Sequence, residues 1–141
     1  MKSYITNSAK ETQNLAGKIA RSFKGSIIAL SGSLGAGKTT FTQGFAKGLG
    51  VKGRIISPTF VLIRSHHIPK SHKVFSHIDL YRLESEKDFA ALGLKELLND
   101  PNNIILIEWA DKIKDLLPQN ATWINFESEN ETHRKITISY N

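Results

Sequence analysis

The most informative motif in the sequence is Gly32-Ser33-Leu34-Gly35-Ala36-Gly37-Lys38-Thr39, which matches the pattern G-x-x-x-x-G-K-[ST]. The almost wholly apolar run from Ser26 to Ser31 precedes it and is typical of a strand buried on both faces. The segment from Phe41 to Leu49 follows as an expected helix and ends at Gly50. Because the motif requires a strand before it and a helix after it, we predict a phosphate-binding loop (P-loop) rather than an ordinary glycine-rich turn.

The residue types in this loop match the chemistry of phosphate binding. Glycines allow left-handed backbone conformations that turn N–H groups toward an anion. A helix that begins near Lys38 also points its positive dipole end at the phosphates. Lys38 can reach the β- and γ-phosphates, and the Thr39 hydroxyl can bind Mg²⁺. We therefore expect a nucleoside triphosphate with Mg²⁺.

Two carboxylates follow apolar runs and are candidates to complete this site. Glu108 comes directly after Ile104–Ile107, and Asp79 follows Val74–Ile78. The more apolar run before Glu108 predicts a more central strand, so Glu108 is the better Mg²⁺ partner. Asp79 could orient or deprotonate the attacking water, or support the metal through water. For both residues the alternative is a surface carboxylate or a helix cap.

Two further sequence features are candidates to lie near a bound nucleotide. Trp109 follows Glu108 and is either a rigid ring near the nucleotide or an ordinary aromatic residue. Ser57–Phe60 lies between the P-loop helix and the next strand, where a nucleotide-sensing loop with Thr59 as its hydroxyl would sit. The alternative is that Pro58 only marks the entry to a strand.

The rest of the chain alternates strands with helices, which predicts an α/β domain. We expect a three-layer, P-loop NTPase-like fold with a mixed central sheet and helices on both faces. With no repeat, linker or internal boundary, residues 1–141 are predicted to form a single P-loop ATPase domain. The expected helices are a Ser8-capped helix to about Phe23, two short helices in Glu84–Leu98 and Asp111–Leu117; the expected hairpins pair Thr59–Ser65 with Val74–Tyr81, and Ala121–Phe126 with Lys135–Tyr140.

Composition narrows the class of protein further. The chain has no cysteine, which excludes disulfides and thiolate metal sites and favours a cytoplasmic location. Its longest strongly apolar run, Ile104–Ile107, is far shorter than the roughly 20 residues of a membrane span. Lys and Arg number 19 against 13 Asp and Glu, and this net charge of +6 favours a polyanionic partner.

A basic cluster lies between the two middle strands. Its members are Arg64, His66, His67, Lys70, His72 and Lys73. A polyanion such as tRNA could bind there, or the cluster could be a solvated hairpin tip, since aromatic residues for base stacking are missing. A histidine metal site is a further alternative, although the loop supplies no carboxylate.

Four motifs occur in a fixed order: Leu34-Gly35-Ala36-Gly37-Lys38-Thr39-Thr40-Phe41, Ser57-Pro58-Thr59-Phe60, His77-Ile78-Asp79-Leu80-Tyr81-Arg82-Leu83 and Ile107-Glu108-Trp109. Together they resemble the bacterial TsaE (YjeE) family, from about Ser8 to Pro118. The resemblance implies a protein that binds ATP and Mg²⁺ and hydrolyses ATP slowly. It also implies a role in forming threonylcarbamoyladenosine (t6A) at position 37 of ANN-decoding tRNAs, with the TsaD–TsaB pair performing the transfer itself.

The resemblance also assigns residues. It implies phosphate contacts from Gly35, Ala36, Gly37, Lys38, Thr39 and Thr40, Mg²⁺ at Thr39 and Glu108, and a part in hydrolysis for Asp79. It places Ser8–Thr12 near the base and Arg134 near the nucleotide, and Asp111 either touches the nucleotide or caps the next helix. Ser33 departs from the Glu or Asp common in the family, on the variable side of the loop.

Two other functions stay open at this point. The first is a small P-loop kinase, which would need an acceptor pocket and usually an arginine-rich lid. The second is a non-hydrolysing module, in which the nucleotide only orders Ser57–Phe60 for partner docking. Whether tRNA is contacted directly or only through TsaD and TsaB is likewise open.

Overall fold

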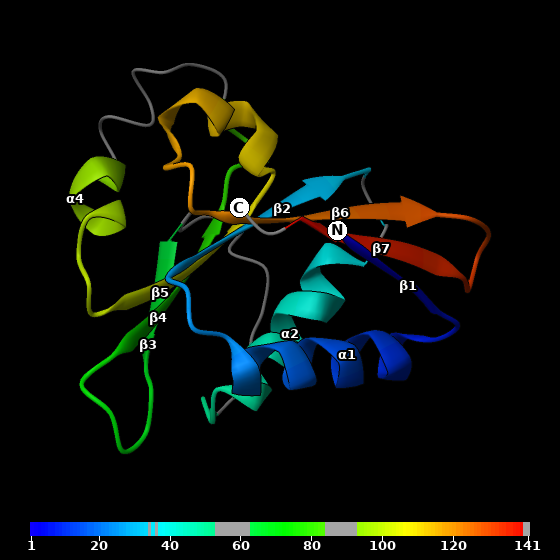
Figure 1. Cartoon of the computed structure of the whole chain (residues 1–141), viewed down its shortest axis with the longest axis horizontal. Helices are drawn as coiled ribbons and strands as arrows, with labels where there is room; N and C mark the ends of the chain where they lie inside the picture. Colours follow the sequence, from blue (N-terminus) through cyan, green and yellow to red (C-terminus); the bar gives the residue numbers. More distant parts are fainter. Residues whose placement is uncertain (34, 36, 53–62, 84–92, 140–141) are drawn as a thin grey trace.

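The computed structural model describes residues 1–33, 35, 37–52, 63–83 and 93–139. Within these ranges seven strands form one mixed sheet in the order β1-β7-β6-β2-β5-β4-β3 (Figure 1). The strands are β1 (Lys2–Thr6), β2 (Ile27–Gly32), β3 (Ile63–His67), β4 (Val74–Asp79), β5 (Asn103–Glu108), β6 (Thr122–Ser128) and β7 (Arg134–Ser139). The four inner strands β6, β2, β5 and β4 are parallel, whereas β3, β7 and β1 pair with their neighbours in antiparallel fashion.

Helices cover both faces of this sheet. On one face lie α1 (Ala9–Ser22) and α2 (Lys38–Gly48), packed against each other and the sheet (Figure 1). The other face is covered by α4 (Leu94–Leu98) and by a 3₁₀ helix, η1 (Ala110–Leu116). The expected α/β fold with three layers and a mixed sheet is thereby confirmed.

The burial of the central strands on both faces explains why their sequences are unbroken apolar runs. In β2, Ile28 and Leu30 point toward α1 and α2, whereas Ile27 and Ala29 point toward η1. Strand β5 divides its side chains between the two faces in the same way. Because both faces of a parallel sheet are buried by crossover helices, alternation gives no polar face here.

The expected cap of the first helix is also present. Ser8 is the N-cap of α1, and its hydroxyl accepts a hydrogen bond from the Glu11 amide at 3.1 Å. The Glu11 carboxylate accepts in return from the Asn7 amide at 2.7 Å. Two amides without helical partners are satisfied by this reciprocal pair, which fixes where α1 begins.

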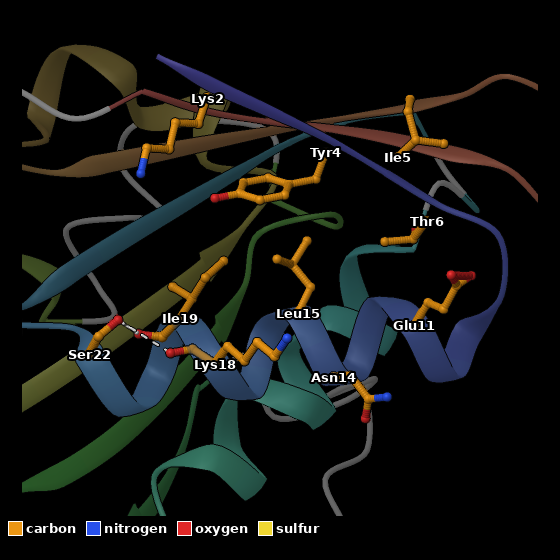
Figure 2. Close-up of a pocket in the computed structure, with 10 residues that line it drawn as sticks. All are labelled: Lys2, Tyr4, Ile5, Thr6, Glu11, Asn14, Leu15, Lys18, Ile19 and Ser22. Carbon is orange, nitrogen blue, oxygen red and sulfur yellow. Dashed lines mark hydrogen bonds between the residues drawn. The ribbon is translucent and has the colours of Figure 1, made fainter.

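Strand β1 was not predicted from the sequence. It pairs with β7, with Lys2 opposite Ile138 and Thr6 opposite Arg134. Figure 2 shows Tyr4 of β1 lying over Leu15 and Ile19 of α1. This short edge strand therefore joins the beginning of α1 to the end of the sheet.

Several predicted boundaries need correction. The middle hairpin is antiparallel as expected, but β3 continues to His67, so Arg64, His66 and His67 lie on a strand rather than in a loop. The helix expected at Asp111–Leu117 is a 3₁₀ helix that begins at Ala110 and is kinked at Ile113.

The prediction for Glu84–Leu98 is tested only at α4, because residues 84–92 lie outside the described part of the chain. Thr59 and the rest of the expected sensing loop lie outside it as well. No helix among the described residues is both long enough and apolar enough to span a membrane.

Candidate functional site

The carboxyl ends of β2, β5 and β4 meet at one edge of the sheet. Leu30 of β2 lies opposite Glu108 of β5, and Glu108 lies opposite Asp79 of β4. After β2 the chain builds β3, β4 and β5 on one side of it and then crosses to β6 on the other. Such a topological switch point is where open α/β sheets bind their ligands.

The P-loop leaves β2 at this edge, and its glycines are required by geometry. Gly32 has φ 127°, and a Cβ there would lie 2.3 Å from the carbonyl oxygen of Phe126 on β6. Gly37 is the N-cap of α2 with φ 102°, a left-handed conformation that glycine adopts without strain. The loop can therefore pass close to β6 and still direct the N-terminus of α2 toward the edge of the sheet.

Lys38, the first residue of α2, is held inside the loop. Its Nζ donates to the carbonyl oxygens of Gly32 at 2.6 Å and of Ser33 at 3.3 Å. The same ammonium lies 3.6 Å from the centre of the Trp109 ring, a cation–π contact. Burial lowers the pKa of Lys38 from 10.5, against the opposing effect of the carboxylates of Glu108, Asp111 and Asp79. Four of the predicted site residues therefore act on this cation.

Glu108 is buried and has a partner for each of its carboxylate oxygens. The Thr39 hydroxyl donates to Oε1 at 3.1 Å. Nε2 of His77, on the neighbouring strand β4, lies 2.5 Å from Oε2. The carboxylate is thereby oriented toward α2 from two directions, and its remaining lone pairs stay available to a ligand.

The environment of His77 assigns its tautomer. A carboxylate only accepts hydrogen bonds, so we assign the proton to Nε2, which then donates to Glu108. Nδ1 is buried without a hydrogen-bond partner among the described residues. As an unprotonated acceptor it leaves no buried donor unsatisfied, which costs less than an orphaned N–H.

Asp79 and Asp111 lie close to this centre in different ways. Asp79 lies two residues after His77 on β4, so both side chains are on the same face of the sheet. The Oδ1 atom of Asp79 accepts a hydrogen bond from the Tyr81 amide at 3.0 Å. Asp111 is exposed in the first turn of η1. Both act on Lys38 electrostatically and favour its charged form.

A cavity of about 380 Å³ opens on the other side of the P-loop. It is lined by the start of α1, the P-loop and the β6–β7 turn, through Asn7, Ser8, Ala9, Thr12, Gly35, Gly37, Thr40, Glu131, Thr132 and Arg134. Arg134 reaches across the cavity, and its Nη2 donates to the Gly35 carbonyl at 3.4 Å. Of the residues predicted near the base, Ser8, Ala9 and Thr12 therefore share one cavity with the loop.

Most of the candidate residues come together at this edge. They are Gly35, Gly37, Lys38, Thr39, Thr40, Asp79, Glu108, Trp109, Asp111 and Arg134. Ala36 and Thr59 lie outside the described residues. His77 is not among the candidate residues that the sequence predicts. The available signal was its position two residues before Asp79, which places both side chains on the same face of β4.

Other features of the described chain lie apart from this edge. A groove of about 550 Å³ between β1 and α1 has no P-loop residue in its lining (Figure 2). His66 stacks on Phe75, with ring centres 6.3 Å apart. In the part of the chain that the structure describes, no three His, Cys, Asp or Glu side chains gather as a metal site. The histidine metal site is therefore not supported.

Comparison with known proteins gives a consistent result. The family model for "Threonylcarbamoyl adenosine biosynthesis protein TsaE" matches residues 6–136. Proteins named tRNA threonylcarbamoyladenosine biosynthesis protein TsaE are similar over most of the chain. The one from Rickettsia felis is 41% identical, covering 97% of this chain and 79% of its own length. Those from Bacillus subtilis and Treponema pallidum are 38% and 33% identical, covering 95% and 96% of this chain and 82% and 98% of theirs.

A solved structure agrees with these relatives. The crystal structure of Bacillus subtilis YdiB superposes with a TM-score of 0.75 at 31% identity. The match covers 99% of this chain and 84% of that one. The likeness therefore extends from β1 to the terminal hairpin and includes the P-loop edge.

Proposed function

Because the chain belongs to the TsaE family, we propose that it is an ATP-binding, slowly hydrolysing subunit that supports formation of t6A at position 37 of ANN-decoding tRNAs. In this proposal it works with TsaD and TsaB in the cytoplasm and does not itself transfer the threonylcarbamoyl group. ATP and Mg²⁺ bind at the edge of the sheet where β2, β5 and β4 end.

The observation that carries the proposal is the hydrogen bond between Thr39 and Glu108. It joins the last residue of the P-loop motif to a buried carboxylate on the adjacent strand, at 3.1 Å. P-loop NTPases bring a hydroxyl and an acidic residue together in this way to hold their metal. A glycine-rich turn without nucleotide chemistry would have no need of a buried acid beside it.

The donor set suits Mg²⁺. The Thr39 hydroxyl and the Glu108 carboxylate are hard oxygen ligands, and Mg²⁺ is commonly held by one or two protein oxygens together with substrate phosphates and water. When bound, the ion would neutralise charge on the β- and γ-phosphates. Among the described residues no three His, Cys, Asp or Glu side chains form a metal-binding group, and such a site is compatible with this because phosphates supply the other oxygens.

The remaining residues have defined tasks in binding ATP. Backbone N–H groups of the loop and of the first turn of α2 donate to the phosphates. Lys38 exchanges its bonds to the Gly32 and Ser33 carbonyls for the β- and γ-phosphates. The cavity beside Arg134 and Ser8 has the position and the polar lining to receive the nucleoside.

Asp79 is the residue we assign to the attacking water. It lies at the end of β4 opposite Glu108 in the parallel register, within electrostatic range of Lys38. A carboxylate there can orient a water molecule toward the γ-phosphate, and in phosphoryl transfer positioning and charge stabilisation supply most of the acceleration. Slow hydrolysis is consistent with a site that has one such group and depends on partners for the rest.

ATP binding is the first test. Titration calorimetry with and without Mg²⁺ should give a higher affinity with the ion for the wild type. Thr39→Ala and Glu108→Gln should bind metal-free ATP as the wild type does but should lose most of the gain from Mg²⁺. A wild type with no affinity for ATP in either condition would refute the proposal.

Reconstitution tests the biological role and separates hydrolysis from docking. t6A formation would be followed over several turnovers with TsaD, TsaB and a supply of threonylcarbamoyl-adenylate, with and without this protein. Asp79→Asn should bind ATP, fail to hydrolyse it and fail to sustain repeated turnover. Full support of turnover by Asp79→Asn would instead favour a nucleotide-gated docking module.

A further inference from the structure

The charge of this chain is divided very unequally along the sequence. Residues 1–78 contain twelve Lys and Arg but one acidic residue, a net charge of +11. Residues 79–141 contain seven Lys and Arg and twelve Asp and Glu, a net charge of −5. Such asymmetry is a recognised sign of an interaction with a polyanion.

The fold converts this asymmetry into a basic face. Helices α1 and α2 both come from the positive part and lie side by side on the same face of the sheet (Figure 1). The opposite face is covered by α4 and η1, which come from the negative part. Helices α1 and α2 together carry five Lys and Arg against one acidic residue, whereas the charges within α4 and within η1 cancel. The helical face that carries α1 and α2 is therefore the more basic of the two.

A groove of about 370 Å³ runs along the outer side of this helix pair. Four basic side chains line it, from Lys10, Lys18 and Arg21 of α1 and Lys47 of α2. The rest of the lining is amide or glycine, and it includes no acidic residue and no apolar side chain. The single acid of α1, Glu11, bonds to the Asn7 amide and lines the groove between β1 and α1 instead.

The small residues explain why a concavity exists here. A Cβ on Gly44 would lie 2.4 Å from the Gln13 carbonyl oxygen, and one on Gly48 would lie 2.6 Å from the Gly17 carbonyl oxygen. The two helices therefore approach backbone to backbone, and the longer basic chains stand around the contact. The helices fix the backbone positions from which these basic side chains extend into the groove.

The lining favours a phosphate backbone over a protein or a lipid surface. Protein interfaces usually have an apolar centre with few lysines. The lining of this groove contains no apolar side chain and four basic ones. Interfacial membrane binding likewise needs apolar anchors. Lys, Arg, Gln and Asn side chains are the usual partners of phosphate and sugar oxygens in nucleic acids. The lack of aromatic residues predicts contact with the backbone rather than with stacked bases.

We infer that the groove between α1 and α2 is a docking site for the phosphate backbone of an RNA, independent of the nucleotide site. Lys18, Arg21 and Lys47 contact phosphates, and the amides of the lining meet phosphate or ribose oxygens. Binding through this groove needs neither ATP nor the proposed ATPase activity, so the two ideas can fail separately.

The test is the salt dependence of RNA binding by the full chain. Fluorescence anisotropy with an unmodified tRNA transcript would be recorded between about 50 and 200 mM KCl, without nucleotide. The variant Lys18→Gln/Arg21→Gln/Lys47→Gln should bind about tenfold or more weakly at the upper end. Its slope of log K against log salt should be smaller by about 2 to 3, since each lost phosphate contact removes roughly 0.7 to 0.9.

A matched variant removes the same charge elsewhere. Arg64→Gln/Lys70→Gln/Lys73→Gln also loses three cations, from the exposed β3–β4 hairpin, and should keep the affinity and the slope of the wild type. Equal losses of RNA affinity in the two variants would show that only the net charge of the protein matters. A loss of affinity in the hairpin variant alone would show that the RNA binds at the hairpin. Each result overturns the inference.

Two further outcomes would also overturn it. A wild type that binds no tRNA at the lowest salt would do so directly. Polyglutamate that binds as tightly as tRNA, and loses its affinity in the groove variant, would show that the groove receives an acidic protein. Unchanged thermal unfolding and ATP affinity in both variants are the controls for folding.

Discussion

His77 and Glu108 lie in contact at the carboxyl edge of the sheet, with Nε2 of the imidazole 2.5 Å from Oε2 of the carboxylate. Both side chains are buried, and the other carboxylate oxygen accepts from Thr39. The contact therefore joins β4 to β5 at Glu108, a residue proposed to bind Mg²⁺. An acid held from two sides needs little rearrangement when a ligand arrives, and we assign His77 as a positioning residue for Glu108.

Removing this contact should weaken Mg²⁺ binding without affecting metal-free ATP. In His77→Leu the carboxylate loses a donor, and changes of this kind typically lower metal affinity by roughly 10- to 100-fold. His77→Gln retains an N–H donor and should recover most of the loss. The measurement is the ratio of ATP dissociation constants with and without Mg²⁺, together with direct Mn²⁺ titration by electron paramagnetic resonance.

Ser76→Ala is the control for disturbance of the strand. Ser76 is equally buried on β4 but lies on its other face, where it bonds to Asn103. This variant should keep the full gain from Mg²⁺. If His77→Leu behaves like Ser76→Ala, the histidine only fills space; a wild type without any gain would refute the metal proposal instead.

Trp109 should report when Lys38 moves. The Lys38 ammonium lies over the Trp109 ring and must leave it, at least in part, to reach a phosphate. In a Trp123→Phe background, ATP should therefore change the emission of the remaining tryptophan, since the charge next to its ring changes. A Trp109→Phe protein, with Trp123 left in place, should show little change. An unaltered spectrum at saturating ATP in the first protein would contradict the displacement of Lys38.

ATP affinity should depend on pH through Lys38. Burial lowers the pKa of this lysine from 10.5, so the apo protein loses the charge at a lower pH than an exposed lysine would. Bound phosphates favour the charged form and raise the pKa again. Affinity should therefore be full below the lowered pKa and fall as the pH rises through it, with uptake of a proton on binding.

Lys38→Arg provides the comparison, because arginine stays charged throughout this range. Whatever its absolute affinity, its profile should be flat between about pH 7 and pH 10. Calorimetry in two buffers of different ionisation enthalpy measures the proton uptake. A wild-type profile as flat as that of Lys38→Arg would exclude the coupling.

The P-loop edge was predictable because its signals are local. Gly32, Gly37 and Lys38 lie in one motif, and the apolar run before Glu108 indicates a buried central strand. The apolar run before Asp79 made it a candidate as well, whereas Arg134 came only from the family resemblance, because neither spacing nor composition could place it beside the loop. Arg134 is 99 residues from Gly35, and only the pairing of β6 with β7 brings the two together.

The parts that were missed depend on contacts between distant segments. Strand β1 carries a mixed polar sequence, and its partner β7 is about 130 residues further along the chain. The role of His77 depends on the register between β4 and β5, which sequence periodicity does not define. The basic groove depends on which faces α1 and α2 turn to each other, and close packing at Gly44 decides that.

Gly44 and Gly17 provide a last prediction, in which the same substitution has opposite effects. A Cβ on Gly44 would lie 2.4 Å from the carbonyl oxygen of Gln13, a backbone atom that cannot move without shifting α1. A Cβ on Gly17 would meet the mobile end of Arg21 at 3.3 Å and the Gly44 carbonyl at 3.6 Å. Gly17→Ala should therefore gain up to about 1 kcal/mol from helix propensity. Gly44→Ala should lose about 1 to 2 kcal/mol net, because the overpacking exceeds that gain. Urea unfolding measures both, and equal effects would show that the helix contact is not tight. Since α2 begins at Lys38, a displaced α2 should also lower ATP affinity in Gly44→Ala but not in Gly17→Ala.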